Sequence, residues 1–258
     1  MKRLVAAALA FCSLHSFAAD ALRVCADPDN LPFSRADGSG FENRIAQLIA
    51  DDMKRPLEYA WLPDRRGFVR KTLGAQQCDV IIGVPAGFER TATTQPYYRS
   101  TYVFVERADA PPVHSFDDPR LASMRIGVQL IGNDLAASPP GAVLARLGDI
   151  DNVRGYPIVG DTPSAQRAID ALERGEIDGA FLWGPQAGYF ARHSAVPLRV
   201  AALPAPAGAH FEFAIAMGVR RGDAQLRERL ADFIRRRQPD IDRVLAAYGV
   251  PLVEKAQP

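Results

Sequence analysis

Residues 78–105, which read CDVIIGVPAGFERTATTQPYYRSTYVFV, decide the fold of this chain. Asp79 opens an apolar run typical of a buried strand, a Gly/Pro loop follows, and Arg90 ends that loop. A Pro-Tyr-Tyr corner then leads into a second apolar run that begins at Thr101. This order predicts two strands of one sheet, with the polar groups of their connection gathered beyond the end of the first strand.

The preceding residues complete a repeating α/β unit. Residues 22–27 (LRVCAD) and 57–62 form short apolar runs typical of strands. Between them, apolar residues from Phe41 to Ile49 recur at helical spacing, and a second helical pattern covers residues 68–75. This β-α-β-α-β order predicts a parallel sheet whose two faces are covered by helices.

The same order then returns. Residues 124–129 (MRIGVQ) resemble residues 22–27, and LERGEIDGAFLW at 172–183 parallels LGAQQCDVIIGV at 73–84, with a leucine six residues before an aspartate in both. This self-similarity predicts two similar lobes.

Two apolar segments connect these lobes. Residues 101–107 run outward and residues 211–219 run back, which predicts two hinge strands. An amphipathic helix follows, predicted to stop near Pro239, and a last short helix begins at Ile241. The chain is thus expected to fold as an α/β protein with two parallel-sheet lobes. The predicted parts are a signal peptide at 1–18, the first part of lobe 1 at 19–105, lobe 2 at 106–210, and a return strand with C-terminal helices at 211–258.

The N-terminus predicts export to the periplasm. Lys2 and Arg3 precede a short apolar run, and Ser16-Phe17-Ala18 is a small-x-small cleavage site. The run is too short to span a bilayer. Loss of Lys2 and Arg3 would change the formal net charge from +1 to −1, which leaves no basic excess for binding nucleic acid.

After cleavage two cysteines remain, Cys25 and Cys78. An oxidising periplasm favours a disulfide between them. Against it, the predicted strand register offsets the two by about 13 Å, more than one bridge can span. A disulfide and two buried thiols therefore both stay open.

Five sequence segments resemble a known family: LRVCADPDNLPFS, GFVRKTL, ATTQPYYRSTYVFV, FLWGPQAGY and FAIAMGVRRGD. The chain resembles type II periplasmic solute-binding proteins over essentially its whole mature length. In these segments its sequence is similar to the MxaJ/MoxJ/XoxJ-type proteins, which are encoded beside PQQ-dependent methanol and other alcohol dehydrogenases. The resemblance implies a non-enzymatic accessory protein that activates, matures or assists the dehydrogenase. The implied partners are that enzyme and its cytochrome c, with no cofactor of its own.

The lobe 1 ligand site of the amino-acid-binding branch is only partly kept. That branch holds a ligand carboxylate with two hydroxyls and an arginine. Here Arg90 remains, while Gly83 and Pro85 stand where the hydroxyls would be, and Pro85 also lacks an N–H donor. Arg90 either contacts a ligand or pairs with an acid such as Glu89 or Asp79.

Lobe 2 departs further from that branch. Gln129 and Asn133 occupy the turn where the branch has hydroxyls at a helix N-terminus, and Trp183 replaces its ammonium-binding aspartate. Trp183 either offers its ring face to a planar or cationic group or packs between the lobes.

On lobe 1 the resemblance places Asp27, Asn30 and Phe33 in the cleft, although Asp27 and Asn30 are also common turn formers. The histidines show no metal-binding spacing, and no nucleophile motif occurs, so no metal site and no enzymatic activity are expected. The alternative functions are an ABC-transporter receptor for a small anionic or planar solute, and an enzyme using Asp27 as acid or base.

Overall fold

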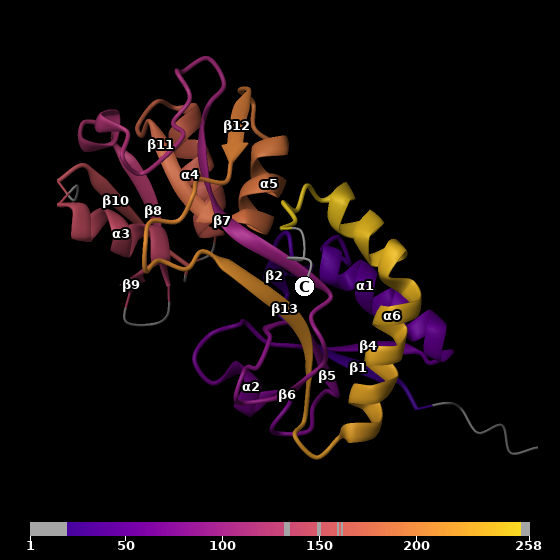
Figure 1. The fold of residues 1–258 in the computed structure, drawn as a ribbon. Helices are drawn as coiled ribbons and strands as arrows, with labels where there is room; N and C mark the ends of the chain where they lie inside the picture. The colour runs from indigo at the N-terminus through magenta and orange to yellow at the C-terminus, as the bar shows by residue number, and fades with distance from the viewer. Residues whose placement is uncertain (1–19, 132–134, 149–150, 159, 161, 254–258) are drawn as a thin grey trace, which may run out of the picture.

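The computed structural model describes residues 20–131, 135–148, 151–158, 160 and 162–253, and shows two α/β lobes connected by long strands (Figure 1). One mixed sheet runs through both lobes in the order β10-β8-β11-β7-β13-β5-β1-β4. The predicted signal peptide and Asn133 lie outside the described residues. None of the helices in the described ranges combines the length and apolar character needed to cross a bilayer.

Lobe 1 is built around a parallel trio of strands with β1 in the centre, paired with β4 and β5. Apolar side chains of α1 and α6 cover one face of this trio, and a smaller cluster that includes both cysteines covers the other. The elements are β1 (Leu22–Ala26), β2 (Asp29–Asn30), β3 (Ser34–Arg35), α1 (Phe41–Met53), β4 (Leu57–Trp61), α2 (Phe68–Lys71), β5 (Val80–Pro85), β6 (Ala92–Thr93) and α6 (Ala224–Ala247).

Lobe 2 repeats this plan with β8 in the centre of a parallel trio, paired with β10 and β11. Side chains of α4 and α5 pack on one face and those of α3 on the other. The elements are η1 (Pro119–Ala122), β8 (Ile126–Ile131), β9 (Ala136–Ala137), α3 (Pro139–Leu147), β10 (Val153–Pro157), α4 (Ser164–Glu173), β11 (Gly179–Trp183), α5 (Gly184–Arg192) and β12 (Leu198–Ala201).

The strands β7 (Tyr98–Arg107) and β13 (Glu212–Val219) connect the lobes. The first half of β7 pairs with β13, and its second half pairs with β11 and β12 of lobe 2. These pairings are all antiparallel, as is that of β13 with β5. The predicted α/β class is confirmed, with a sheet that is parallel inside each lobe and antiparallel at the connection.

An equivalent arginine–aspartate pair occurs in both lobes, where it joins the first strand to the start of the neighbouring parallel strand. The Arg23 guanidinium donates through Nε and Nη2 to the two carboxylate oxygens of Asp79, at 3.2 and 2.7 Å, and the Asp79 N–H donates to the Arg23 carbonyl at 2.7 Å. Arg125 and Asp178 repeat these bonds at 3.0, 2.5 and 2.8 Å. The aspartates that mark the sequence repeat therefore hold equivalent structural positions.

These aspartates are stabilised as anions. Burial opposes ionisation of Asp79, but hydrogen bonds from Arg23 and Arg220 outweigh it and hold the pKa of that carboxyl below its ordinary value. The hydrogen bond from the Arg125 side chain likewise lowers the pKa of Asp178. Each pair thus satisfies two polar groups at the start of a buried strand.

The helix predicted to stop near Pro239 does not stop there. Helix α6 continues through Pro239 to Ala247. Leu230, Ile241 and Leu245 are all fully buried, because they lie along one face of the helix against the lobe 1 core. Burying the last two turns outweighs the cost of about 3 kcal/mol for an interior proline, which sequence propensity alone could not show.

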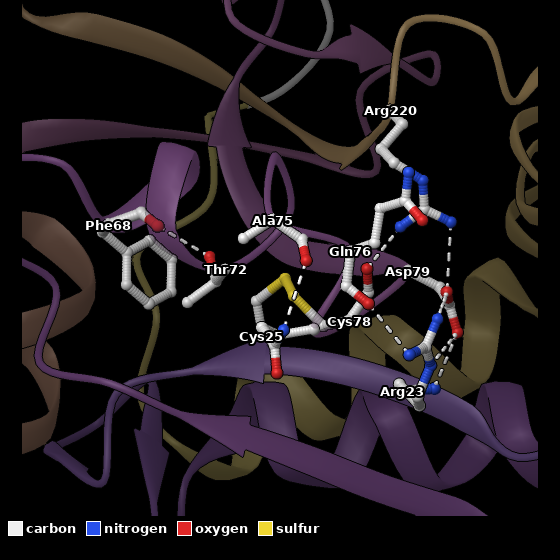
Figure 2. The surroundings of a disulfide bond; sticks show 10 residues. Arg23, Cys25, Phe68, Thr72, Ala75, Gln76, Cys78, Asp79 and Arg220 are labelled. Atoms are coloured by element: carbon white, nitrogen blue, oxygen red, sulfur yellow. Dashed lines mark hydrogen bonds and ion pairs between the residues drawn. A yellow bond between two sulfur atoms is a disulfide. The ribbon is translucent and has the colours of Figure 1, made fainter.

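The argument against a disulfide was wrong, because Cys25 and Cys78 are bonded with their Cα atoms 5.3 Å apart (Figure 2). The register estimate placed Cys78 inside the strand, but β5 begins only at Val80. Before that point the chain turns over the face of the sheet, where Phe68, Leu73 and the two cysteines form one buried cluster. The predicted second helix is also shorter than expected, since α2 ends at Lys71 and gives way to this turn.

A third contact between the lobes lies at the C-terminal end of α6. The Ser100 hydroxyl donates to the Pro251 carbonyl at 2.6 Å, and Arg192 on α5 donates to the carbonyl of Ala246 at 3.0 Å. Gly188 on α5 allows the closest approach, because a Cβ there would lie 1.9 Å from the Gly249 carbonyl oxygen. The end of α6 therefore packs directly on lobe 2.

We expect reduction of the Cys25–Cys78 disulfide to lower the free energy of unfolding by about 3–4 kcal/mol. The bond closes a loop across a sequence separation of 53 residues, which restricts the unfolded chain. Urea unfolding with and without reductant measures the effect. The Cys25→Ala, Cys78→Ala double variant should be similarly destabilised and insensitive to reductant, and equal stability of reduced and oxidised protein would contradict the expectation.

Candidate functional site

A cavity of about 600 Å³ lies between the two lobes, with walls from both of them. A smaller inner pocket of about 180 Å³ extends from it into lobe 1 and shares Asp27, Pro85 and Trp183 with it. Because β7 and β13 pass beside it, the cavity lies where a change in the angle between the lobes would alter its width.

Six of the predicted site residues line this cavity. They are Asp27, Asn30, Phe33, Pro85, Gln129 and Trp183. These residues come from strand ends and the loops after them, in agreement with the expectation for parallel sheets, where ligands meet the carboxyl ends of the strands.

Arg90 lies elsewhere. It is exposed and borders a separate depression on lobe 1, together with Arg66 and Arg70. The loop after β5 turns back at once, since the Phe88 N–H donates to the Pro85 carbonyl at 3.0 Å and Gly87 takes a positive φ of 77°. The carboxylate of Asp79, one of its two proposed partners, is occupied by Arg23 and Arg220.

Trp183 is the centre of an aromatic wall. Its ring lies 5.3 Å from that of Tyr102 and 5.8 Å from that of Phe213, measured between centroids, and all three residues line the cavity. Trp183 is half-buried, so the tryptophan both packs and contributes to the cavity surface. Tyr102 and Phe213 were not among the sequence-predicted residues, because each lies within a hinge strand that had been assigned only a connecting role.

Gln129 is already saturated by internal hydrogen bonds. Its amide Nε2 donates to Ser164 Oγ and to Gln186 Oε1, both at 2.8 Å. Its Oε1 accepts from the Trp183 backbone N–H at 2.6 Å. Since the residue is 1% exposed, Gln129 holds the start of α5 in place and presents no free polar group to a solute.

Asp27 is similarly engaged. Its Oδ1 accepts from the Asp29 N–H at 2.9 Å and its Oδ2 from the Asp64 N–H at 2.6 Å. The carboxylate therefore joins the loop after β1 to the loop after β4. This supports the turn-forming role that the sequence left open, because both carboxylate oxygens accept a hydrogen bond from the backbone.

The inner pocket contains a carboxyl group that the sequence did not reveal. This is Glu42, in the first turn of α1, which lines the inner pocket beside Gly83 of β5. A Cβ atom on Gly83 would lie only 2.1 Å from the Glu42 Oε1. A glycine inside a strand signals such a close approach. Desolvation, reinforced by the charge of Asp64, raises the pKa of Glu42 to about 8.

Asp64 adds a second perturbed acid to the same region. The residue is exposed, and it lines both the cavity and the inner pocket. Desolvation and the nearby charge of Asp27 raise the pKa of Asp64 to about 6. Near neutral pH Glu42 is therefore largely protonated and can release its proton when a positive charge arrives, whereas Asp64 is largely ionised.

The charges around the cavity favour a cation over an anion. The acidic residues that line the two pockets are Asp27, Asp29, Glu42 and Asp64, whereas Arg65 is the one basic residue among those described. All four acids belong to lobe 1. The described lobe 2 lining is uncharged, and no group of acidic, histidine or cysteine residues in the described ranges is arranged to hold a metal ion.

Comparisons with known proteins place this geometry in context. Residues 75–250 match the family model of the bacterial extracellular solute-binding proteins. The chain is 33% identical to Protein MoxJ of Methylorubrum extorquens, over 91% of this chain and 82% of that protein.

Solved structures of related periplasmic proteins are also similar to this chain. Periplasmic binding protein XoxJ from Methylobacterium extorquens is 38% identical, with a TM-score of 0.77, covering 91% of this chain and all of that one. MxaJ from Methylophaga aminisulfidivorans is 28% identical, also with a TM-score of 0.77, covering 90% and 100%. The similarity thus extends over both lobes and the cavity between them.

The raised pKa of Glu42 should make the stability of the protein depend on pH. A pKa raised from 4.5 to about 8 means that the folded state binds more protons than the unfolded state in this window. The free energy of unfolding should therefore fall as pH rises from about 5 to 8, by at most about 1.4 kcal/mol per pH unit from this group. Urea unfolding across that range should show a flatter profile for Glu42→Gln. Glu58→Gln, at an exposed position on β4, should keep the wild-type slope, and a wild-type slope in Glu42→Gln would contradict the assignment.

Proposed function

The chain belongs to the bacterial extracellular solute-binding proteins and, within them, to the MxaJ/MoxJ/XoxJ type, and from this we propose that it is a non-enzymatic periplasmic accessory protein of a PQQ-dependent methanol or alcohol dehydrogenase. It uses the solute-binding scaffold to activate, mature or assist the enzyme. Its partners are the dehydrogenase and the cytochrome c that serves it. The near full-length similarity to MoxJ and XoxJ supports this assignment.

The wall of lobe 2 is the observation that carries the proposal. A receptor for amino acids grips its ligand from both lobes through charged groups, as the resemblance implies. Here the described lobe 2 lining consists of Gln129, Ile131, Pro139, Ile158, Gly160, Pro163, Ser164, Trp183 and Gln186, without a charged side chain. Gln129 is satisfied internally, and Arg90 lies outside the cavity. A scaffold without charged ligand contacts from both lobes fits a role in assisting the dehydrogenase better than a role in amino-acid transport.

We expect the purified protein to capture the dehydrogenase, or its cytochrome c, from a periplasmic extract of the same source. A strain lacking the protein should show reduced dehydrogenase activity that the wild-type gene restores. Affinity capture followed by mass spectrometry, together with an activity assay on the deletion strain, tests both points. No association combined with normal activity in the deletion strain would overturn the proposal.

One observation supports a second candidate function, a receptor for a small cationic solute. Glu42 and Asp64 lie beside aromatic side chains, and an ammonium group is stabilised by carboxylates and by ring faces together. This revises the anionic solute expected from Arg90, because an anion would meet Asp27, Asp29 and Asp64 around the cavity. A planar solute remains compatible with the Trp183 wall.

A fluorescence titration separates the two functions. In a Trp61→Phe background Trp183 is the remaining tryptophan, since the chain contains two. If the protein is a receptor, a panel of alkylamines and diamines should include a ligand that quenches Trp183. Glu42→Gln should weaken that ligand at least about tenfold, which corresponds to about 1.4 kcal/mol.

The affinity of such a ligand should also rise with pH up to about 8, because the cation displaces the Glu42 proton. Glu58→Gln should bind like the wild type. The absence of quenching by every amine would exclude the receptor role for this class of solute.

A further inference from the structure

A second depression, of about 940 Å³, lies on lobe 1 and shares no lining residue with the cavity between the lobes. Three segments meet there: α2 with its flanking turns, the loop after β5, and the turn between β13 and α6 (Figure 1). Its basic residues are Arg66, Arg70, Lys71, Arg90, Arg220 and Arg221, and its one acidic residue is Glu89. We call this surface the basic basin.

Much of the positive charge in the basin is uncompensated. Arg220 is bound to Asp79 and Asp223, and Arg221 donates to the Glu89 carbonyl. The other four basic residues are exposed and form no ion pair with any residue that the structure describes. Elsewhere in the molecule arginines such as Arg125, Arg199 and Arg236 lie against carboxylates.

This concentration of charge is local. The whole chain has a formal net charge of only +1, so the basin does not reflect a general excess of basic residues. Like charges this close repel one another and destabilise the fold slightly unless a counter-charge binds. A surface that keeps this arrangement is suited to an anionic partner.

The basin is also rigidly supported. Phe68 of α2 and Leu73 belong to the buried cluster that contains the Cys25–Cys78 disulfide (Figure 2). The Thr72 hydroxyl donates to the Phe68 carbonyl at 2.8 Å, which fixes the end of α2. Side chains carried on such a support lose less conformational freedom when they bind.

We propose that the basic basin docks a carboxylate-rich segment of the chain's protein partner in the dehydrogenase system. This inference rests on the proposed function and adds the site of contact. Planar guanidinium groups match carboxylates in a bidentate manner, and five of the six basic residues are arginines. The concave shape fits a protruding peptide segment.

Other anionic partners fit the basin less well. Among the described residues, the exposed large apolar side chains are those of Leu135, Leu147, Ile158 and Leu252. None of these four lines the basin, so none of them is placed there to insert into a lipid surface. It also lacks the aromatic residues on which single-stranded nucleic acid bases stack. A protein carboxylate is the anion that these features favour.

A charge-reversal experiment tests the docking site. The triple variant Arg66→Glu, Arg70→Glu, Arg90→Glu should bind the purified dehydrogenase at least about tenfold more weakly, and with a weaker dependence on salt concentration. The matched control is Arg44→Glu, Arg146→Glu, Arg227→Glu, which changes the net charge equally at exposed arginines elsewhere. It should bind within about twofold of the wild type. Thermal unfolding checks that both triples are folded.

The outcomes separate this inference from the proposed function. If the wild type binds the dehydrogenase and the basin triple binds it equally well, the docking site is wrong and the accessory role stands. If the wild type binds poly-L-glutamate through the basin but no component of the dehydrogenase system, the proposed function is wrong and the chemistry of the basin stands. Tighter binding of the wild type to phosphatidylglycerol vesicles than to either protein probe, lost in the basin triple, would overturn the inference in favour of a membrane surface.

Discussion

An arginine–aspartate pair at the start of each parallel sheet is the interaction on which the rest of this structure depends. Arg23 with Asp79 and Arg125 with Asp178 join the first strand of a lobe to the strand that leads toward the hinge. Because a shift of one residue would turn every side chain of a strand to the other face, this pairing fixes which residues reach the core and which reach the cleft. Pro85 and Trp183, at the far ends of those strands, line the cavity as a result.

The sequence was informative wherever local pattern and tertiary structure agree. The strand–helix order and the leucine–aspartate repeat predicted two similar α/β lobes, and both lobes have the same central parallel trio. It was misleading where packing outweighs local preference. Helix α6 passes Pro239 because burial of Ile241 and Leu245 continues on the same face, and no propensity records that burial. The disulfide was left open because an extended strand was assumed through Cys78, where the chain in fact turns over the sheet.

In the cleft, too, some residues could be placed from the sequence and others could not. The family resemblance placed residues at strand ends in the cleft, and six of them line the cavity. The direction of Arg90 could not be predicted, because it depends on a single turn at Gly87. Glu42 was missed since an acid in the first turn of a helix is ordinarily a solvated group that favours the helix dipole. Its position is evident only together with Gly83, a residue 41 positions later whose missing side chain makes room for the carboxyl. Pairs of this kind are properties of the folded molecule.

Helix α6 extends between two surfaces of the molecule. Its 24 residues form a rod about 36 Å long. One end packs on lobe 2 through the contact of Gly188 with Gly249, and the other begins at Asp223, which is paired with Arg220 at the edge of the basic basin. The helix thus spans lobe 1 from its contact with lobe 2 to the edge of the basic basin. A single helix therefore runs between the lobe 2 contact and the turn that borders the basic basin, although the basin and the cavity share no lining residue.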